Sequence, residues 1–239
     1  MPALVSLGDT EIMTAIRAVL LYLLPPGVEV IRAYANRVAQ PIGPDYCVLS
    51  ELRRERLATN LNTDVDIKVI GSIAGETMTV TSGPVLLPGT VLFGPTVVAG
   101  SAVTAMLEQA GTYTVAPPQT APAGSRIYAG RHAMRQPVDI VYQCDVYGPN
   151  SNRNALAIHT TWRDERGCQL LAEASQPHGM TPLYADDPRM VGFDNAESQW
   201  EDRWTLELHT QVNLIVTLGQ EFADTLKVDL LPVDLFLIP

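Results

Sequence analysis

The feature that most constrains the fold is a stretch of alternating side chains near the end of the chain. Its apolar positions are Trp204, Leu206, Leu208, Val212, Leu214 and Val216, and its polar positions are Thr205, Glu207, His209, Gln211 and Asn213. A period of two with one apolar face is typical of a half-buried β-strand. At roughly 3.3 Å per residue such a strand is on the order of 40 Å long. We therefore expect it to bend or to extend past the core.

A strand of this length needs a partner. Residues 218–220 interrupt the pattern, and the alternation resumes over residues 226–230. We expect the two segments to pair as a long β-ribbon, which is headed by the sequence QWEDRW at residues 199–204.

The chain is acidic overall. Its formal net charge is −10 over 239 residues, whereas gripping nucleic acid through its phosphates requires a basic surface. An acidic surface can still line a passage through which DNA slides without sticking. The hydrophobic content of 46% is enough for a packed core and excludes a globally disordered chain.

Nothing in the sequence indicates export, a membrane span or a disulfide framework. The first residues, MPALVSLGDTE, lack a basic segment and a continuous apolar run, so we expect no signal peptide. No apolar run is long enough to cross a bilayer. The cysteines, Cys47, Cys144 and Cys168, are widely spaced and odd in number. We expect ordinary buried thiols in a reducing cytoplasm.

The first block of the chain predicts one helix and two strands. Apolar residues at helical spacing place the helix from about Asp9 to Leu23, where the prolines at 25 and 26 stop it. Residues 28–34 and 46–50 read as strands.

The most basic run of the chain follows the second of these strands and contains Arg53, Arg54 and Arg56. One interpretation is a subunit interface or an anion contact. The other is a solvated edge.

Charges nearly vanish between residues 67 and 129, where only Lys68, Glu76, Glu108 and Arg126 remain. Short β-branched stretches alternate there with glycine and proline turns, which is typical of a small all-β module. We expect this module to be an insertion into a main domain made of residues 1–66 and 130–239.

The pattern of the main domain resumes with a predicted strand over residues 139–147. A predicted helix follows from Ser151 to about Arg166 and ends at Gly167. Residues 172–198 read as a long loop, which is usually functional or ordered by a partner. The predicted fold class is α+β, with an antiparallel β-sheet flanked by two main helices and the small all-β module inserted.

No catalytic constellation stands out. The four histidines, His132, His159, His178 and His209, are scattered, and no phosphate-binding, dinucleotide-binding or nucleophile motif occurs. Asp186, Asp187 and Asp194 lack a calcium-loop spacing and read as a solvated acidic loop, although a metal site or a hydrolase built on that loop is an alternative. We therefore predict no enzyme activity, no cofactor and no metal.

The segment QWEDRW is the stretch whose residue types point most specifically to a role. These residues are Trp200, Glu201, Arg203 and Trp204. Tryptophan and arginine dominate the energetics of protein interfaces, and an arginine can pair with a carboxylate across strands or subunits. The alternative is a corner of the core with an internal salt bridge. As interface residues we predict Trp200, Glu201, Arg203, Trp204, Arg53, Arg54 and Arg56.

Several ordered pieces of the sequence together resemble the bacteriophage neck (tail) terminator family. They are residues 36–38 (NRV), 46–49 (YCVL), 56–60 (RLATN), 143–151 (QCDVYGPNS), 182–185 (PLYA) and 199–204 (QWEDRW). The resemblance covers roughly residues 10–66 and 130–237, and residues 69–129 depart from the family's minimal form.

The resemblance implies a structural virion protein that is assembled in the host cytoplasm and acts in the neck. It implies a ring of identical copies, expected to be a hexamer, at the head-proximal end of the tail. Such a ring would stop polymerisation of the tail tube protein and would dock onto the head's connector or stopper protein. DNA would meet it only in transit, and no membrane would be involved.

Two alternatives to a terminator remain open within the virion. One is a different neck component, such as a stopper or an adaptor. The other is an adhesin that touches a cell-surface glycan through the neutral module at residues 67–129.

Overall fold

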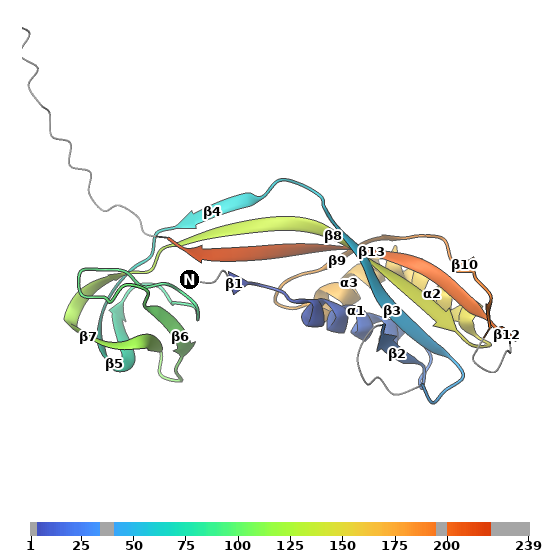
Figure 1. Ribbon diagram of the computed structural model, residues 1–239, viewed down its shortest axis with the longest axis horizontal. Coiled ribbons are helices and arrows are strands. Elements are labelled where there is room, and N and C mark those ends of the chain that lie inside the picture. Colours follow the sequence, from blue (N-terminus) through green and yellow to red (C-terminus); the bar gives the residue numbers. More distant parts are fainter. Residues whose placement is uncertain (1–3, 34–40, 195–199, 221–239) are drawn as a thin grey trace, which may run out of the picture. The chain divides into compact units, whose positions relative to one another are not determined.

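The computed structural model describes residues 4–33, 41–194 and 200–220 (Figure 1). The chain divides into two compact units. Of the described residues, the main unit contains 4–33, 41–63, 133–194 and 200–217, and the glycine-rich unit contains 64–132 and 218–220. Each unit is described by itself below.

The main unit is built on two long neighbouring strands, β8 (Arg131–Tyr147) and β13 (Arg203–Gly219). They run in opposite directions (Figure 1). The strand predicted over residues 204–216 is confirmed. Its predicted partner, residues 226–230, lies outside the described residues.

Three short strands line the other edge of β13, and β11 and β12 form a separate pair. The strands along β13 are β1 (Leu4–Val5), β9 (Thr181–Ala185) and β10 (Arg189–Met190). The separate pair consists of β11 (Phe193–Asp194) and β12 (Trp200–Glu201).

The other side of β8 pairs with β3 (Tyr46–Arg56) and with β4 (Leu61–Val65). The predicted strand at residues 46–50 is therefore longer than expected, because it continues through the basic run and keeps pairing with β8. Beyond β3 lies β2 (Glu29–Arg32), which pairs with β3 in parallel. The prediction of a purely antiparallel sheet is wrong at this edge.

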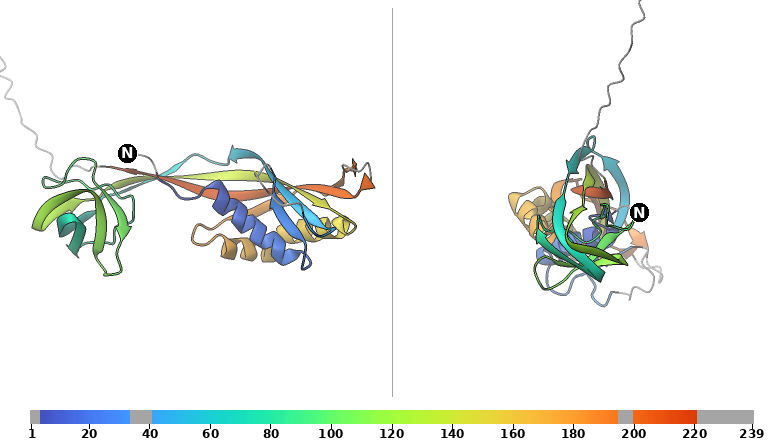
Figure 2. Two further views of the ribbon diagram at one scale, coloured as in Figure 1. Left: turned by 60° about the horizontal axis from the view of Figure 1, so that its bottom comes forward. Right: turned by 90° about the vertical axis from the view of Figure 1, so that its left-hand side faces the viewer.

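Three helices of the described part lie against one face of this sheet (Figures 1 and 2). They are α1 (Asp9–Leu23), α2 (Ser151–Trp162) and α3 (Glu165–Ala174). The prediction for α1 is confirmed. Its first turn is closed by Glu11, whose carboxylate accepts the N–H of Gly8 at 3.1 Å.

The prediction of one helix from Ser151 to Arg166 is wrong, and the described part of the chain has three helices where two main helices were predicted. Helix α2 ends at Trp162, and Asp164 starts α3 by accepting the N–H of Arg166 at 2.9 Å. Gly167 does not end a helix. It lies inside α3, where a Cβ atom would collide with the carbonyl oxygen of Thr161.

The prediction of a long loop over residues 172–198 is also wrong in part. The end of α3, together with β9, β10 and β11, falls within this range. These strands are short, and β9 and β10 take their hydrogen bonds from β13, which is distant in sequence.

The core of the main unit fills the space between the helices and the sheet. It includes Ile12, Ile16 and Leu20 of α1, Ile158 and Trp162 of α2, and Ile140, Cys144, Leu206 and Leu208 of the two long strands. Cys47 and Cys144 are fully buried, as expected for the cysteines, whereas Cys168 is only half-buried. A hydrogen bond with Cys47, together with burial, raises the pKa of the Cys144 thiol.

The described strands of the glycine-rich unit form a sheet of β5 (Lys68–Ser82), β7 (Thr112–Tyr128) and β6 (Ala102–Met106), in that order. Its own core includes Val69, Ile73, Met78, Tyr113 and Ile127. Strand β5 curls so tightly that a Cβ atom on Gly71 would overlap the carbonyl oxygen of Thr79. A glycine at position 71 is therefore required by the fold of this strand.

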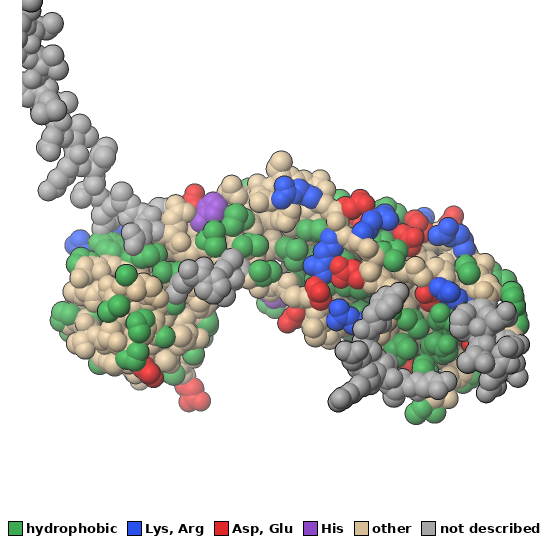
Figure 3. Space-filling model, in the orientation of Figure 1, with side chains coloured by type: hydrophobic (Ala, Val, Ile, Leu, Met, Phe, Trp, Pro, Cys, Tyr) green, Lys and Arg blue, Asp and Glu red, His purple; other side chains and the backbone are tan. Residues whose placement is uncertain are grey.

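Uncharged side chains dominate the surface of this unit, whereas red and blue side chains gather on the main unit (Figure 3). No helix in the described part of the chain is long and apolar enough to cross a membrane.

We predict that Trp162→Phe lowers the free energy of unfolding by on the order of 2 kcal/mol. The indole is fully buried, and its N–H donates to the carbonyl oxygen of His209 at 3.1 Å. The variant loses that bond and leaves a small cavity between α2 and β13. Urea denaturation followed by circular dichroism measures the change.

The matched control is Leu156→Ala on the same helix, because Leu156 is 58% exposed. We expect it to change the free energy of unfolding by about 0.5 kcal/mol or less. Equal losses for the two variants would contradict the placement of Trp162 in the core.

Candidate interface on the polar face and edge of the sheet

The face of the main sheet opposite the helices is lined by polar and charged side chains. In β8, alternate residues from Val138 to Val146 belong to the core, so the residues between them point to the other face. We call this other face the polar face. It carries Arg53, Glu55, Asp139, Gln143, Asp145, Arg203, Thr205, Glu207 and His209.

Arg203 lies on this face and pairs with Asp145 of the neighbouring strand. Its Nη2 and Nε atoms are 2.9 Å and 3.2 Å from the Asp145 Oδ1 atom. Thr205 and Gln143 also donate to the Asp145 carboxylate, at 2.6 Å and 2.7 Å. Burial alone would lower the pKa of Arg203, but the bonds to Asp145 raise it above its ordinary value. The partner of Arg203 is thus a strand of the same chain.

The two tryptophans of the QWEDRW segment lie in different environments. Trp204 is half-buried and packs against the core. Trp200 is 66% exposed, and its indole covers Gly192 so closely that a Cβ atom there would overlap the ring. Glu201 is half-buried, and its charge adds to burial in raising the pKa of Tyr46. Of these two tryptophans, Trp200 is the one that presents a large apolar surface to solvent.

The three arginines of the basic run each have partners within the chain. Arg54 binds Glu51 at 2.5 Å through Nε and Asp9 at 2.5 Å through Nη2, which ties β3 to the start of α1. These contacts, with the Glu51 bond as the largest cause, raise the pKa of Arg54.

Arg53 and Arg56 also have partners within the chain. Arg53 binds Glu55 at 2.8 Å and lies 3.8 Å from Glu207. The Arg56 guanidinium faces the side-chain amide of Gln136. The arginines of the basic run are therefore exposed to solvent and paired within the chain, and their role in a subunit interface stays a prediction.

An apolar patch lies at the edge of the sheet and was not predicted from the sequence. Met190 and Val191 are 52% and 43% exposed, and the Trp200 indole lies beside them on Gly192. We call Met190, Val191 and Trp200 the edge patch. In the described residues β10 pairs only with β13, so it lies at an edge of the described sheet. The segment was interpreted as a loop, so no strand edge was expected there.

A buried histidine–carboxylate pair lies at the centre of the polar face. The Nδ1 atom of His209 is 2.7 Å from the Asp139 Oδ2 atom, and both residues are almost fully buried. The ring of Tyr184 stacks on the imidazole with centroids 4.0 Å apart. The sequence placed His209 on the polar side of its strand but did not reveal this pairing, because Asp139 is 70 residues away.

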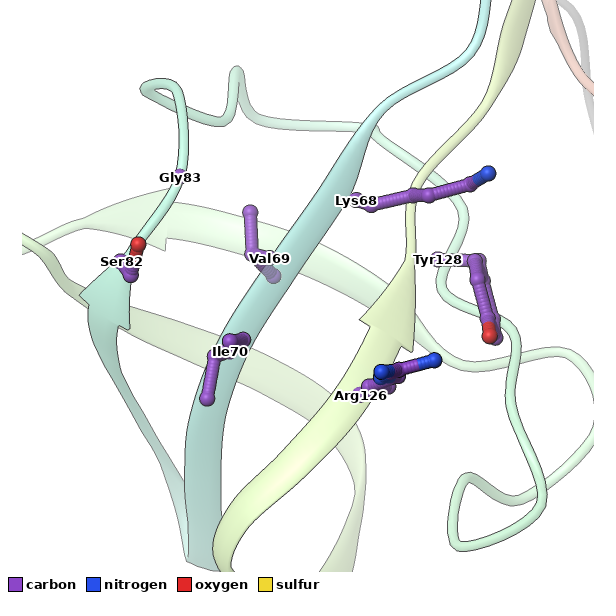
Figure 4. A pocket seen from close by; sticks show the side chains of 7 residues that line it. All are labelled: Lys68, Val69, Ile70, Ser82, Gly83, Arg126 and Tyr128. Carbon is purple, nitrogen blue, oxygen red and sulfur yellow. The ribbon is translucent and has the colours of Figure 1, made fainter.

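The glycine-rich unit contains a shallow pocket of about 400 Å³ (Figure 4). Lys68 and Ile70 of β5 stand opposite Tyr128 and Arg126 of β7, respectively, and Ser82 and Gly83 complete the rim. The Lys68 ammonium is 3.1 Å from Asp66 and 6.0 Å from the centroid of the Tyr128 ring. Two cations and one aromatic ring thus gather on a surface that is otherwise nearly uncharged.

A protein-family model described as phage neck terminator protein matches residues 106–234, which is more than half of the 239 residues. The match includes β7, β8, α2, α3 and β13, and it begins inside the glycine-rich unit. No curated protein matches the chain.

We predict that Arg203→Ala lowers the free energy of unfolding of the isolated chain by about 1–2 kcal/mol, because it removes the cation beside the buried Asp145 carboxylate. In a double-mutant cycle with Asp145→Asn, we expect a coupling energy of about 1 kcal/mol. Chemical denaturation of the four proteins measures both values.

Arg189→Ala is the matched control, because the Arg189 side chain is 66% exposed and lies 4.0 Å from the Glu207 carboxylate. We expect a change within about 0.5 kcal/mol. Additive losses in the cycle would show that Arg203 and Asp145 do not interact in solution.

Proposed function

The chain belongs to the phage neck terminator protein family, a family of structural virion proteins, and we propose that it forms a ring at the head-proximal end of a phage tail. The ring consists of identical copies, six in our proposal. It stops polymerisation of the tail tube protein and joins the tail to the connector or stopper protein of the head. The ring performs no catalysis. It is assembled in the host cytoplasm and becomes part of the virion.

The observation that carries this proposal, beside the family match, is the edge patch. An edge strand with exposed apolar side chains favours pairing with another chain, and tryptophan is a frequent anchor of protein interfaces. If each copy adds its edge to a different surface of the next copy and the rotation between copies closes, the contacts form a ring that leaves no free edge. Trp200 belongs to this patch and is the interface residue we propose with the strongest support.

The distribution of charge is compatible with DNA in transit. The chain is acidic overall, and the arginines of the polar face are engaged with carboxylates of the same chain. These pairs and the acidic balance make the polar face poorly suited to hold phosphates, so DNA would pass through the ring without being trapped.

A second candidate function is supported by the pocket of the glycine-rich unit. Lys68, Arg126 and Tyr128 offer cations and a ring face, a combination that suits an acidic sugar. In this alternative the protein is a virion adhesin that binds a cell-surface glycan through residues 67–129, which we propose as a module inserted in the main domain. A third candidate is another neck component, which differs in its position within the virion.

We predict that Trp200→Ser combined with Met190→Ser abolishes ring formation and leaves the isolated chain folded. Both side chains are largely exposed, so their loss costs little packing within the chain, whereas an interface loses its apolar anchors. Analytical ultracentrifugation and negative-stain microscopy of the purified protein provide the measurement.

The control is Leu156→Ser, an equally exposed apolar residue on α2. It should form rings as the wild type does. Rings that survive the double substitution would remove the edge patch from the interface.

A phage that carries an early stop codon in this gene should produce filled heads beside unattached tails, many of them longer than normal. The reason is that nothing would stop the tube or bridge it to the head. Electron microscopy of the lysate shows the outcome directly.

Two other outcomes of the same experiment would contradict a terminator. Unattached tails of normal length would indicate a stopper or an adaptor. Complete virions that fail to adsorb would move the function to the glycine-rich unit.

A further inference from the structure

We propose that Asp186, Glu207 and His209 bind a divalent transition-metal ion on the polar face. One ligand atom from each of these residues lies within 4.8 Å of the others. Asp186 directly follows β9, and its N–H donates to the carbonyl oxygen of Glu207 at 2.9 Å, which holds it beside β13. Glu207 and His209 are two residues apart on the same face of β13. The inference does not depend on the proposed function.

One ring nitrogen of His209 is held by a carboxylate, which is common for metal-binding histidines. Its Nδ1 atom bonds to the buried carboxylate of Asp139 at 2.7 Å, and the Tyr184 ring stacks against it. A neutral imidazole that donates from Nδ1 to a carboxylate leaves the lone pair of Nε2 for a metal. Asp139 thereby becomes a positioning residue for the ligand, and it need not touch the ion.

The two carboxylates of the site are not neutralised by close ion pairs. In the described part of the chain the half-buried Asp186 carboxylate has no hydrogen bond or ion pair of its own. Glu207 meets Arg53 at 3.8 Å and Arg189 at 4.0 Å, both near the outer limit of an ion pair. Two carboxylates held close together repel each other, and a divalent ion between them removes that repulsion.

The ligand types indicate which ion fits. One imidazole nitrogen and two carboxylate oxygens are a set that suits Zn²⁺, with Co²⁺ and Mn²⁺ as substitutes. Three protein ligands leave a coordination position for water or for a group from another molecule. Mg²⁺ prefers an all-oxygen octahedral shell and should bind poorly.

Neighbouring titratable residues do not share this arrangement. Asp187 is 91% exposed and turns toward His159, whose Nε2 atom is 3.3 Å away. His132 pairs with Asp64 at 2.6 Å but belongs to no group of three ligands in the described residues. Both residues therefore offer matched controls.

The test is isothermal titration of the EDTA-treated full chain with ZnCl₂, together with thermal unfolding in the presence and absence of Zn²⁺. We expect one ion per chain and a higher unfolding temperature with the metal. Asp186→Asn and Glu207→Gln should each weaken binding at least about tenfold, because each removes an anionic ligand. Asp139→Asn should weaken it by about 10- to 100-fold.

Asp187→Asn and His132→Ala should bind Zn²⁺ as the wild type does. The proposal fails if the wild type binds no Zn²⁺, or if Asp187→Asn weakens binding as much as Asp186→Asn. Substitution with Co²⁺ adds a spectroscopic check. An intense thiolate absorption band would place the ion on a cysteine and would also overturn the site.

Discussion

The pairing of β8 with β13 is the constraint on which the rest of the main unit depends. Each strand presents apolar side chains to the helices and polar side chains to the opposite face, so one register decides both the core and the polar face. Two side-chain contacts between the strands support that register, Arg203 with Asp145 and His209 with Asp139. The buried carboxylates lie where a shift in register would leave them without partners, which is expensive in a low-dielectric environment.

Patterns of neighbouring residues predicted the helix and the strand that are marked by their own sequence. The alternation of residues 204–216 and the helical spacing of residues 9–23 were sufficient to predict β13 and α1. The break between α2 and α3 was missed because Asp164, a helix cap, looks like an ordinary polar residue in a longer helix. The strands β9 and β10 were missed because they form their hydrogen bonds with β13. Pairing with a strand distant in sequence leaves no pattern in the short segments themselves.

The sequence predicted which residue types the candidate interface contains. It did not predict which of them are exposed or which residues they contact. The sequence singled out Trp200 and Trp204 together, yet only the first is exposed, since β13 turns the second toward the core. The arginines were recognised as a charged run, but their partners Asp9 and Gln136 lie far away in sequence. Likewise, Glu207 and His209 share a visible spacing, whereas Asp139 comes from β8 and Asp186 from the segment that follows β9. Family membership, by contrast, was accessible from ordered short pieces of sequence.

The strict alternation along β13 has a consequence for how genes of this kind can vary in length. A deletion or insertion of a single codon within the strand would exchange its two faces, so that Glu207 would point toward the helices and Leu208 toward the polar face. Changes in length should therefore accumulate at turns such as the one at Gly148, where the backbone has a positive φ of 101°. Related genes should differ in length between their long strands and remain of constant length within them.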